Sequence, residues 1–184
     1  MKNNFSYYNF YNRRVKRIYP ALILVLLLVV WLAIRYSDVE HLKMITKTMA
    51  ASTVFGANIE ILTYKQGYWD ANVKTNPLLH LWSLGVEEQF YIFWPFLISL
   101  ILTKFQSKSL QILSAFTVIS FIFNIIAVSY DAKFDFYFPF CRFWQMAIGG
   151  LLAANIVKVK NTLYAHILST VGLLTILIAS FILS

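Results

Sequence analysis

The sequence has few charged residues and almost no cysteine. Only 13% of its 184 residues are charged, whereas 59% are hydrophobic. Soluble domains normally carry about 25% charged residues. A water-soluble core of this size cannot hide so much apolar surface, but a lipid bilayer can accept it. The composition therefore excludes an ordinary soluble domain and favours an integral membrane protein.

Acidic residues are scarce as well, with 8 Asp and Glu against 16 Lys and Arg, for a net charge of +8. The basic residues stand at the ends of apolar runs, which is typical of topology signals and of contact with anionic lipid headgroups. We therefore expect membrane lipids as partners and no nucleic acid. The single Cys141 excludes an intrachain disulfide and lacks metal-ligand spacing, so neither a metal nor a bound cofactor is expected.

The apolar runs predict an all-α, polytopic bundle of transmembrane helices. A span needs about 20 mostly apolar residues, and the first seventeen residues lack the apolar stretch of a cleavable signal peptide. We expect a single, partial membrane domain over residues 1–184. Five full spans are predicted near residues 18–34, 81–103, 109–129, 136–157 and 161–184.

Residues 42–62 are ambiguous because they contain Lys47, Asn58 and Glu60. They form either a sixth span or an interfacial or re-entrant helix. Cytoplasmic loops are enriched in Lys and Arg, and the second reading keeps Lys104 and Lys108 inside with a cytoplasmic N-terminus. We therefore favour an interfacial segment in a multi-pass membrane protein.

Residues 76–91 carry the most informative pattern. Asn76 followed by Pro77 is a favoured helix start. Polar side chains then recur on one helix face, and ionisable groups at membrane depth usually face a bundle interior or a wet cavity. The residues on this face are His80, Ser83, Glu87 and Tyr91, with Glu88 about a quarter-turn away.

Two further segments place arginines near membrane helices. Arg14 and Arg17 lie one turn apart at the cytoplasmic end of the first predicted span, and two guanidiniums on one face suit a phosphate-bearing ligand. Arg142 lies inside the fourth. At 1.5 Å per residue, Arg142 and Glu87 both sit about 25 Å from the cytoplasmic face. Matched depth predicts an ion pair between Arg142 and either Glu87 or Glu88.

Each of these features also has a purely structural interpretation. The basic residues from Arg13 to Arg17 serve equally well as positive-inside anchors. Arg142 could simply be satisfied by helix packing, and Glu87 and Glu88 could cap the outer end of a helix. The remaining candidates, His80 and Trp82, fit an interfacial aromatic belt.

Three segments resemble the acyltransferase 3 family. Residues 76–91, NPLLHLWSLGVEEQFY, closely resemble its signature. Residues 10–20 resemble its Arg-x-x-Arg segment, with Arg14 and Arg17 as the matching pair. Residues 142–149 resemble an Arg-x-Trp-Glu-Leu-x-x-Gly segment in which Gln145 replaces the acidic residue. The family's first helix, with its catalytic His, and its later helices have no counterpart, so the chain looks like a member incomplete at both ends.

The family comprises bacterial membrane proteins that O-acylate lipopolysaccharide, peptidoglycan and other glycans. The resemblance implies transfer of an acyl group, commonly acetyl, from a cytoplasmic thioester such as acyl-CoA to a hydroxyl of an extracytoplasmic glycan or lipid-linked sugar. His80, ordered by Glu87, is the local substitute for the missing base. The implied catalytic residues are His80, Glu87 and Glu88, and the implied substrate-binding residues are Arg14, Arg17, Arg142, Trp82 and Tyr91.

Two other functions fit the same residues. Intramembrane Arg and Glu also mark permeation paths, as in a transporter or flippase-like bundle. No pair of short helices broken by Gly or Pro supports that alternative. A non-catalytic remnant or partner subunit is the other alternative.

Overall fold

The computed structural model describes residues 6–64, 75–153 and 162–182, and all regular structure within these ranges is helical. The all-α prediction is therefore confirmed. The chain divides into two compact units, Met1–Ile148 and Gly149–Ser184. Each unit is described by itself, and the candidate site lies within the first.

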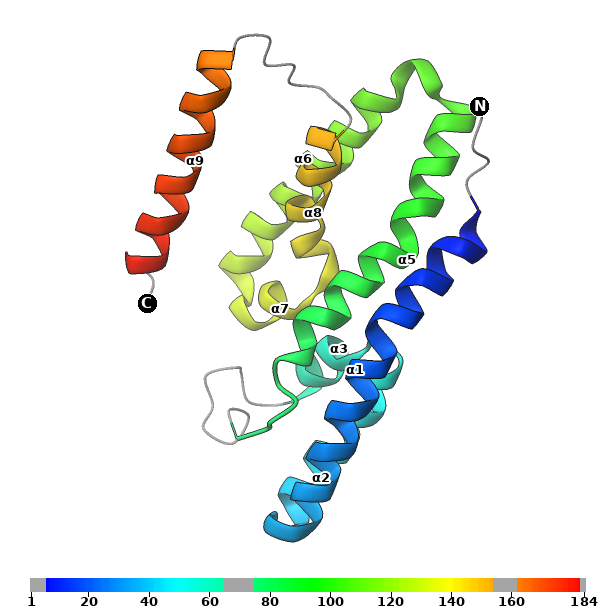
Figure 1. Cartoon of the computed structure of the whole chain (residues 1–184), viewed down its shortest axis with the longest axis vertical. Helices are drawn as coiled ribbons and strands as arrows, with labels where there is room; N and C mark the ends of the chain where they lie inside the picture. Colours follow the sequence, from blue (N-terminus) through cyan, green and yellow to red (C-terminus); the bar gives the residue numbers. More distant parts are fainter. Residues whose placement is uncertain (1–5, 65–74, 154–161, 183–184) are drawn as a thin grey trace. The chain divides into compact units, whose positions relative to one another are not determined.

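The helices of the first unit are labelled in Figure 1. They are α1 (Tyr7–Tyr36), α2 (Val39–Thr53), α3 (Ala57–Thr63), α5 (Leu81–Lys104), the short η1 (Gln106–Lys108), α6 (Ser109–Tyr130), α7 (Ala132–Tyr137) and the larger part of α8 (Pro139–Ala153). The second unit contains the end of α8 and the apolar α9 (Thr162–Ile182).

Among the described residues, four stretches are long and apolar enough to cross a membrane. They are Tyr7–Tyr36, Leu81–Lys104, Gln106–Tyr130 and Leu163–Ile182. These stretches overlap four of the five predicted spans. The first begins well before its predicted start, because the aromatic and basic residues ahead of Ile18 continue the helix after an N-cap at Ser6.

The predicted span at residues 136–157 is not one continuous helix. It begins inside α7, is interrupted at the extended Phe138, and continues as α8 from Pro139. Proline disfavours helical backbone in the residue before it and is well suited to the first position of a new helix. The end of this predicted span, residues 154–157, lies outside the described residues.

The predicted interfacial segment at residues 42–62 is likewise two helices rather than one. α2 ends at Thr53 and α3 starts at Ala57, and Phe55 between them adopts a φ of 56°. A bulky residue in this left-handed region costs roughly 1–3 kcal/mol and persists only where its surroundings hold it there. We call residues 54–56 the elbow.

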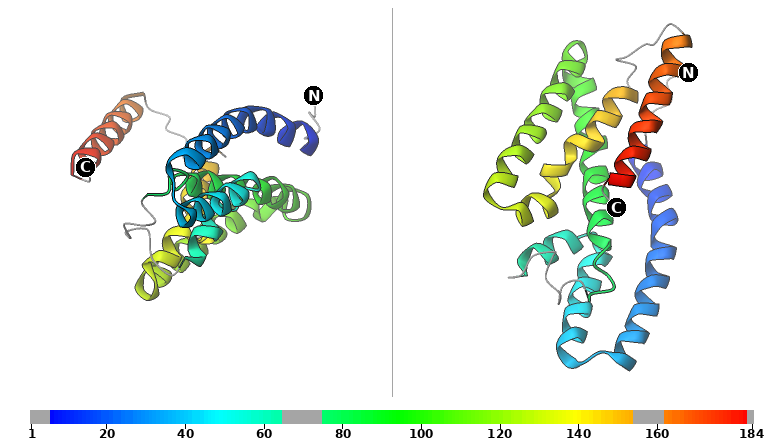
Figure 2. Two further views of the ribbon diagram at one scale, coloured as in Figure 1. Left: turned by 90° about the horizontal axis from the view of Figure 1, so that it is seen from below. Right: turned by 90° about the vertical axis from the view of Figure 1, so that its left-hand side faces the viewer.

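α2 folds back along the second half of α1, as Figures 1 and 2 show. Their shared core includes Leu22, Leu26 and Ala33 from α1 and Ile45 from α2, joined by Leu78. α5 then runs in the direction opposite to α1 (Figure 2). The turn after α5 therefore lies toward the end of this unit where α1 begins.

The elbow is held against α5. Gln89 Nε2 donates to the Phe55 carbonyl oxygen at 2.7 Å and to Asn58 Oδ1 at 2.9 Å. Asn58 Nδ2 in turn donates to the Tyr137 carbonyl oxygen at 3.1 Å. These bonds fix the elbow between α5 and α7, and Gly85 gives it room to approach.

We predict that Gly85→Ala destabilises the protein. A Cβ at Gly85 would lie 2.7 Å from Asn58 Oδ1 and 2.9 Å from the Phe55 carbonyl oxygen, and a backbone carbonyl cannot rotate away. Overpacking of this kind costs roughly 1–3 kcal/mol. The measurement is the thermal unfolding midpoint of the purified protein in detergent. Gly56→Ala is the control, because its Cβ would be an ordinary 3.5 Å from the Ala51 carbonyl oxygen. Equal midpoints for the two variants would contradict the close approach at Gly85.

Candidate functional site

A cavity of about 580 Å³ lies between the first half of α1 and the first half of α5. Its walls combine three arginines and two glutamates with aromatic and aliphatic side chains. The lining residues are Phe10, Arg13, Arg14, Arg17 and Ile18 from α1, and Leu84, Glu87, Glu88 and Tyr91 from α5. The structure thus brings together five of the eight predicted site residues, from segments about 70 positions apart.

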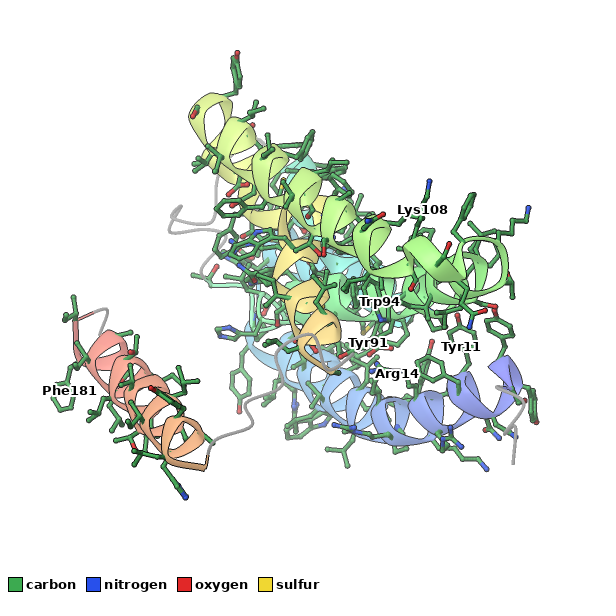
Figure 3. All side chains as sticks on the ribbon, turned by 90° about the horizontal axis from the view of Figure 1, so that it is seen from above. Tyr11, Arg14, Tyr91, Trp94, Lys108 and Phe181 are labelled. Atoms are coloured by element: carbon green, nitrogen blue, oxygen red, sulfur yellow. The ribbon has the colours of Figure 1, made fainter. Side chains whose placement is uncertain are left out.

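Arg14 joins the two walls. Its Nη1 donates to Glu88 Oε1 at 2.5 Å, and its guanidinium carbon lies 3.2 Å from the centroid of the Tyr91 ring. Figure 3 shows Arg14 pointing from α1 toward Tyr91 on α5. The Glu88 side chain is only 8% exposed. A carboxylate shielded to this degree needs a cation beside it, since an unpaired buried charge is strongly unfavourable.

The predicted pairing of Arg142 with Glu87 or Glu88 is therefore wrong. The partner of Glu88 is Arg14, from the segment that we expected at the cytoplasmic end of the first span. The depth estimate failed because α1 already begins at Tyr7. Arg14 lies about two turns inside that helix, at the level of Glu88 rather than below it.

Arg142 and Trp82 belong to a different cluster, at the start of α5. The Arg142 guanidinium carbon lies 4.9 Å from the Phe136 ring centroid, and the Trp82 and Phe136 rings are 4.5 Å apart. Within the described residues, the buried Arg142 Nε has no hydrogen-bond acceptor. This contact with Phe136 fits the structural interpretation of Arg142 as a helix-packing cation.

His80 does not line the cavity. It is the exposed N-cap residue of α5, and its backbone carbonyl accepts a hydrogen bond from Ser83 Oγ at 3.1 Å. Glu87 is seven residues further along, about 10 Å up the helix axis. No contact joins the two side chains in the part of the chain that the structure describes, so the idea that Glu87 orders His80 is wrong.

Arg13 and Tyr11 are the cavity-region residues that sequence reasoning did not single out. Arg13 lines the cavity together with Arg17, and four-residue spacing on a helix could have indicated their shared face. Tyr11 hydroxyl donates to the Ile92 carbonyl oxygen at 2.9 Å and so adds a second link from α1 to α5. The partner of Tyr11 is a backbone atom 81 positions away, which no sequence pattern reveals.

Two mainly apolar cavities adjoin the first one along the same pair of helices. One of about 400 Å³ shares Phe10 and Tyr91 with it and extends along α5 past Trp94. The other, of about 330 Å³, shares Arg17, Ile18 and Leu84 and extends along α1. The charged chamber therefore has an apolar extension in each direction.

Comparison with known proteins identifies the family of this chain. Residues 1–184 match the acyltransferase 3 family model, which is described as an acyltransferase domain. The chain belongs to the acyltransferase 3 family. In this family member, the Arg-x-x-Arg segment and the acidic-aromatic signature form the two walls of one cavity.

The known relatives are longer proteins. An uncharacterized protein of Haemophilus influenzae is 37% identical over 165 residues, which is 83% of this chain and 64% of that protein. YrhL of Bacillus subtilis, provisionally named a peptidoglycan O-acetyltransferase, is 29% identical over 82% of this chain and 24% of its own length. The peptidoglycan O-acetyltransferase OatA of Listeria monocytogenes is 34% identical over 47% of this chain and 14% of its own. No solved structure matches the chain.

Most of the family signature in this chain builds the scaffold. Asn76 Oδ1 accepts from the Leu78 amide at 3.0 Å, and Asn76 Nδ2 donates to Thr48 Oγ1 at 2.8 Å. Leu78 and Leu79 are buried. Together with Gly85 and Gln89 at the elbow, these residues fix where α5 starts and which face it turns to α1.

We predict that Gln89→Leu destabilises the protein whereas Glu87→Gln does not. Leucine keeps the volume but leaves the Phe55 carbonyl and Asn58 without their donor, which costs roughly 1–3 kcal/mol for each group left unsatisfied. Glu87 is exposed and makes no ion pair with any described residue. Thermal unfolding in detergent measures both. A Gln89→Leu midpoint equal to that of Glu87→Gln would show that the elbow bonds contribute nothing.

Proposed function

We propose that this chain forms the donor-binding part of a membrane O-acyltransferase, which transfers an acyl group, most simply acetyl, from acyl-CoA to a glycan hydroxyl. The family and the names of its O-acetyltransferase relatives support the reaction class. The observation that carries the proposal is the cavity between α1 and α5, where arginines line a chamber with apolar extensions. Acyl-CoA likewise combines charged and less polar parts, with phosphates at one end and a thioester arm at the other.

The charge distribution supports a cytoplasmic donor side. The start of α1 lies toward the same end of the first unit as the end of α5 and η1, which carry Lys104 and Lys108 (Figure 1). Arg13 and Arg14 lie about two turns inside α1 from that end. An excess of Lys and Arg marks cytoplasmic ends of membrane helices. On this topology the N-terminus and the donor are cytoplasmic, in a bacterial inner membrane, and α5 starts toward the opposite side, where a glycan acceptor would approach.

The transfer requires a base for the acceptor hydroxyl. In this proposal the hydroxyl oxygen attacks the thioester carbonyl carbon and its proton passes to Glu87. The carbon–sulfur bond then breaks, and the departing thiolate takes the proton from Glu87 and leaves as the thiol. Glu87 is assigned this role over His80 because it lines the cavity and its carboxylate forms no ion pair among the described residues. Glu88 is already bonded to Arg14.

Radiolabelled acetyl-CoA tests the proposal. Membranes containing the wild-type chain should incorporate label into glycan, and Glu87→Gln should reduce the rate by about two orders of magnitude or more, the usual contribution of a general base. His80→Ala should retain most of the activity, because His80 lies outside the cavity.

Loss of activity in His80→Ala with Glu87→Gln unaffected would reverse the assignment of the base. Movement of a labelled lipid-linked sugar across the membrane without acyl transfer would instead support the transporter alternative. Neither activity in well-folded wild-type protein would support a non-catalytic partner subunit.

A further inference from the structure

The three arginines of the cavity are not equivalent. Arg14 has its guanidinium between the Glu88 carboxylate and the Tyr91 ring, with the Phe10 ring centroid 5.6 Å away. Both of the cation's strongest interactions are thus made with the protein itself. An additional anion at Arg14 would have to compete with a carboxylate that is 8% exposed and has Arg14 as its ion-pair partner.

Arg13 and Arg17 have the opposite character. Both side chains are exposed, both line the cavity, and neither makes an ion pair with any residue in the described ranges. Arg17 adds only a weaker, longer-range attraction to the Glu88 carboxylate. Residues four positions apart lie one turn apart on the same side of a helix, so the two guanidiniums form one adjacent pair of donors.

We propose that Arg13 and Arg17 bind the phosphates of the acyl donor, while Arg14 is a positioning residue that holds α1 to α5 through Glu88 and Tyr91. The inference rests on the proposed function for the identity of the ligand, although the positioning role of Arg14 stands without it. It differs from the sequence-based expectation, in which Arg14 and Arg17 were the phosphate-binding pair. Arg13 takes the place of Arg14 as a ligand.

The charges in the cavity fit this division. Arg14 and Glu88 neutralise each other, which leaves Arg13 and Arg17 facing the single carboxylate of Glu87. The remaining net positive charge suits an anionic ligand. Guanidiniums bind phosphate oxygens in a bidentate fashion, and these two have donors available for it because no described carboxylate occupies them.

Coenzyme A binding and thermal stability, measured on the purified full chain in detergent, separate the two roles. Arg13→Gln and Arg17→Gln should each weaken coenzyme A binding roughly tenfold, as expected for loss of a hydrogen bond to a charged group. Their unfolding midpoints should stay at the wild-type value, because these side chains make no ion pair with the described protein. Lys16→Gln, a neighbouring exposed cation that does not line the cavity, is the matched control and should change neither quantity.

Arg14→Gln and Glu88→Gln should each lower the unfolding midpoint by roughly 5 °C or more, because each leaves a shielded charge without its partner. The decisive variant is the charge reversal Arg14→Glu with Glu88→Arg, which restores the pair with its polarity exchanged. It should recover the part of the lost stability that comes from the ion pair, although Glu at position 14 loses the cation contact with the Tyr91 ring. It should bind coenzyme A within a few-fold of wild type.

A charge-reversed protein that regains stability but binds coenzyme A as poorly as Arg17→Gln would show that Arg14 itself contacts the donor, and would overturn the assignment. Wild-type affinity in both Arg13→Gln and Arg17→Gln would overturn it as well. If the wild-type chain fails to bind coenzyme A, the donor assignment and the proposed function fall together, and the stability of the charge-reversed protein still decides whether Arg14 clamps the helices.

Discussion

The ion pair between Arg14 and Glu88 is the constraint on which the site depends. Each charge would be unfavourable at this position without the other. The ion pair therefore fixes how far α1 and α5 are shifted along each other and which faces they turn toward each other. The Tyr91 ring covers the guanidinium, and the Tyr11 hydroxyl adds a bond to α5 about one turn further along. Side chains rather than close backbone contact thus connect α1 to α5. The cavity lies beside these side-chain contacts.

The family signature does two kinds of work in this chain. Asn76, Leu78, Gly85 and Gln89 fix the start of α5 and dock the elbow against it. The acidic residues Glu87 and Glu88 with Tyr91 then face α1. A segment with so little charge elsewhere can keep two adjacent carboxylates because one of them is neutralised across the helix interface. Most residues of the motif therefore position α5, and only Leu84, Glu87, Glu88 and Tyr91 line the cavity.

The long helices could be predicted from the sequence, but which helices pack against each other could not. Apolar length predicted four of the long helices but not the break at Phe138. The helical period correctly placed Glu87 and Tyr91 on the same wall of the cavity. The period does not say which helix will face that wall. Counting residues from the lysine-rich loops placed Glu88 about 25 Å from the cytoplasmic face and Arg14 at that face. In the fold the two side chains are in contact. No proline marks the break between α2 and α3 at Phe55, because this break depends on the hydrogen bond that Gln89, 34 residues later, donates to the Phe55 carbonyl oxygen.

Phe55 has a wider influence than its position suggests. Its ring packs edge-on against Tyr19 of α1 at 5.5 Å, while its carbonyl is held by α5. One residue with unfavourable backbone geometry thus touches both helices that enclose the charged chamber, without lining it. Glycine would adopt the same φ at no steric cost, but it would lose the ring and with it a spacer between the two walls. Phe55 therefore helps to set the distance between α1 and α5, although it does not line the cavity between them.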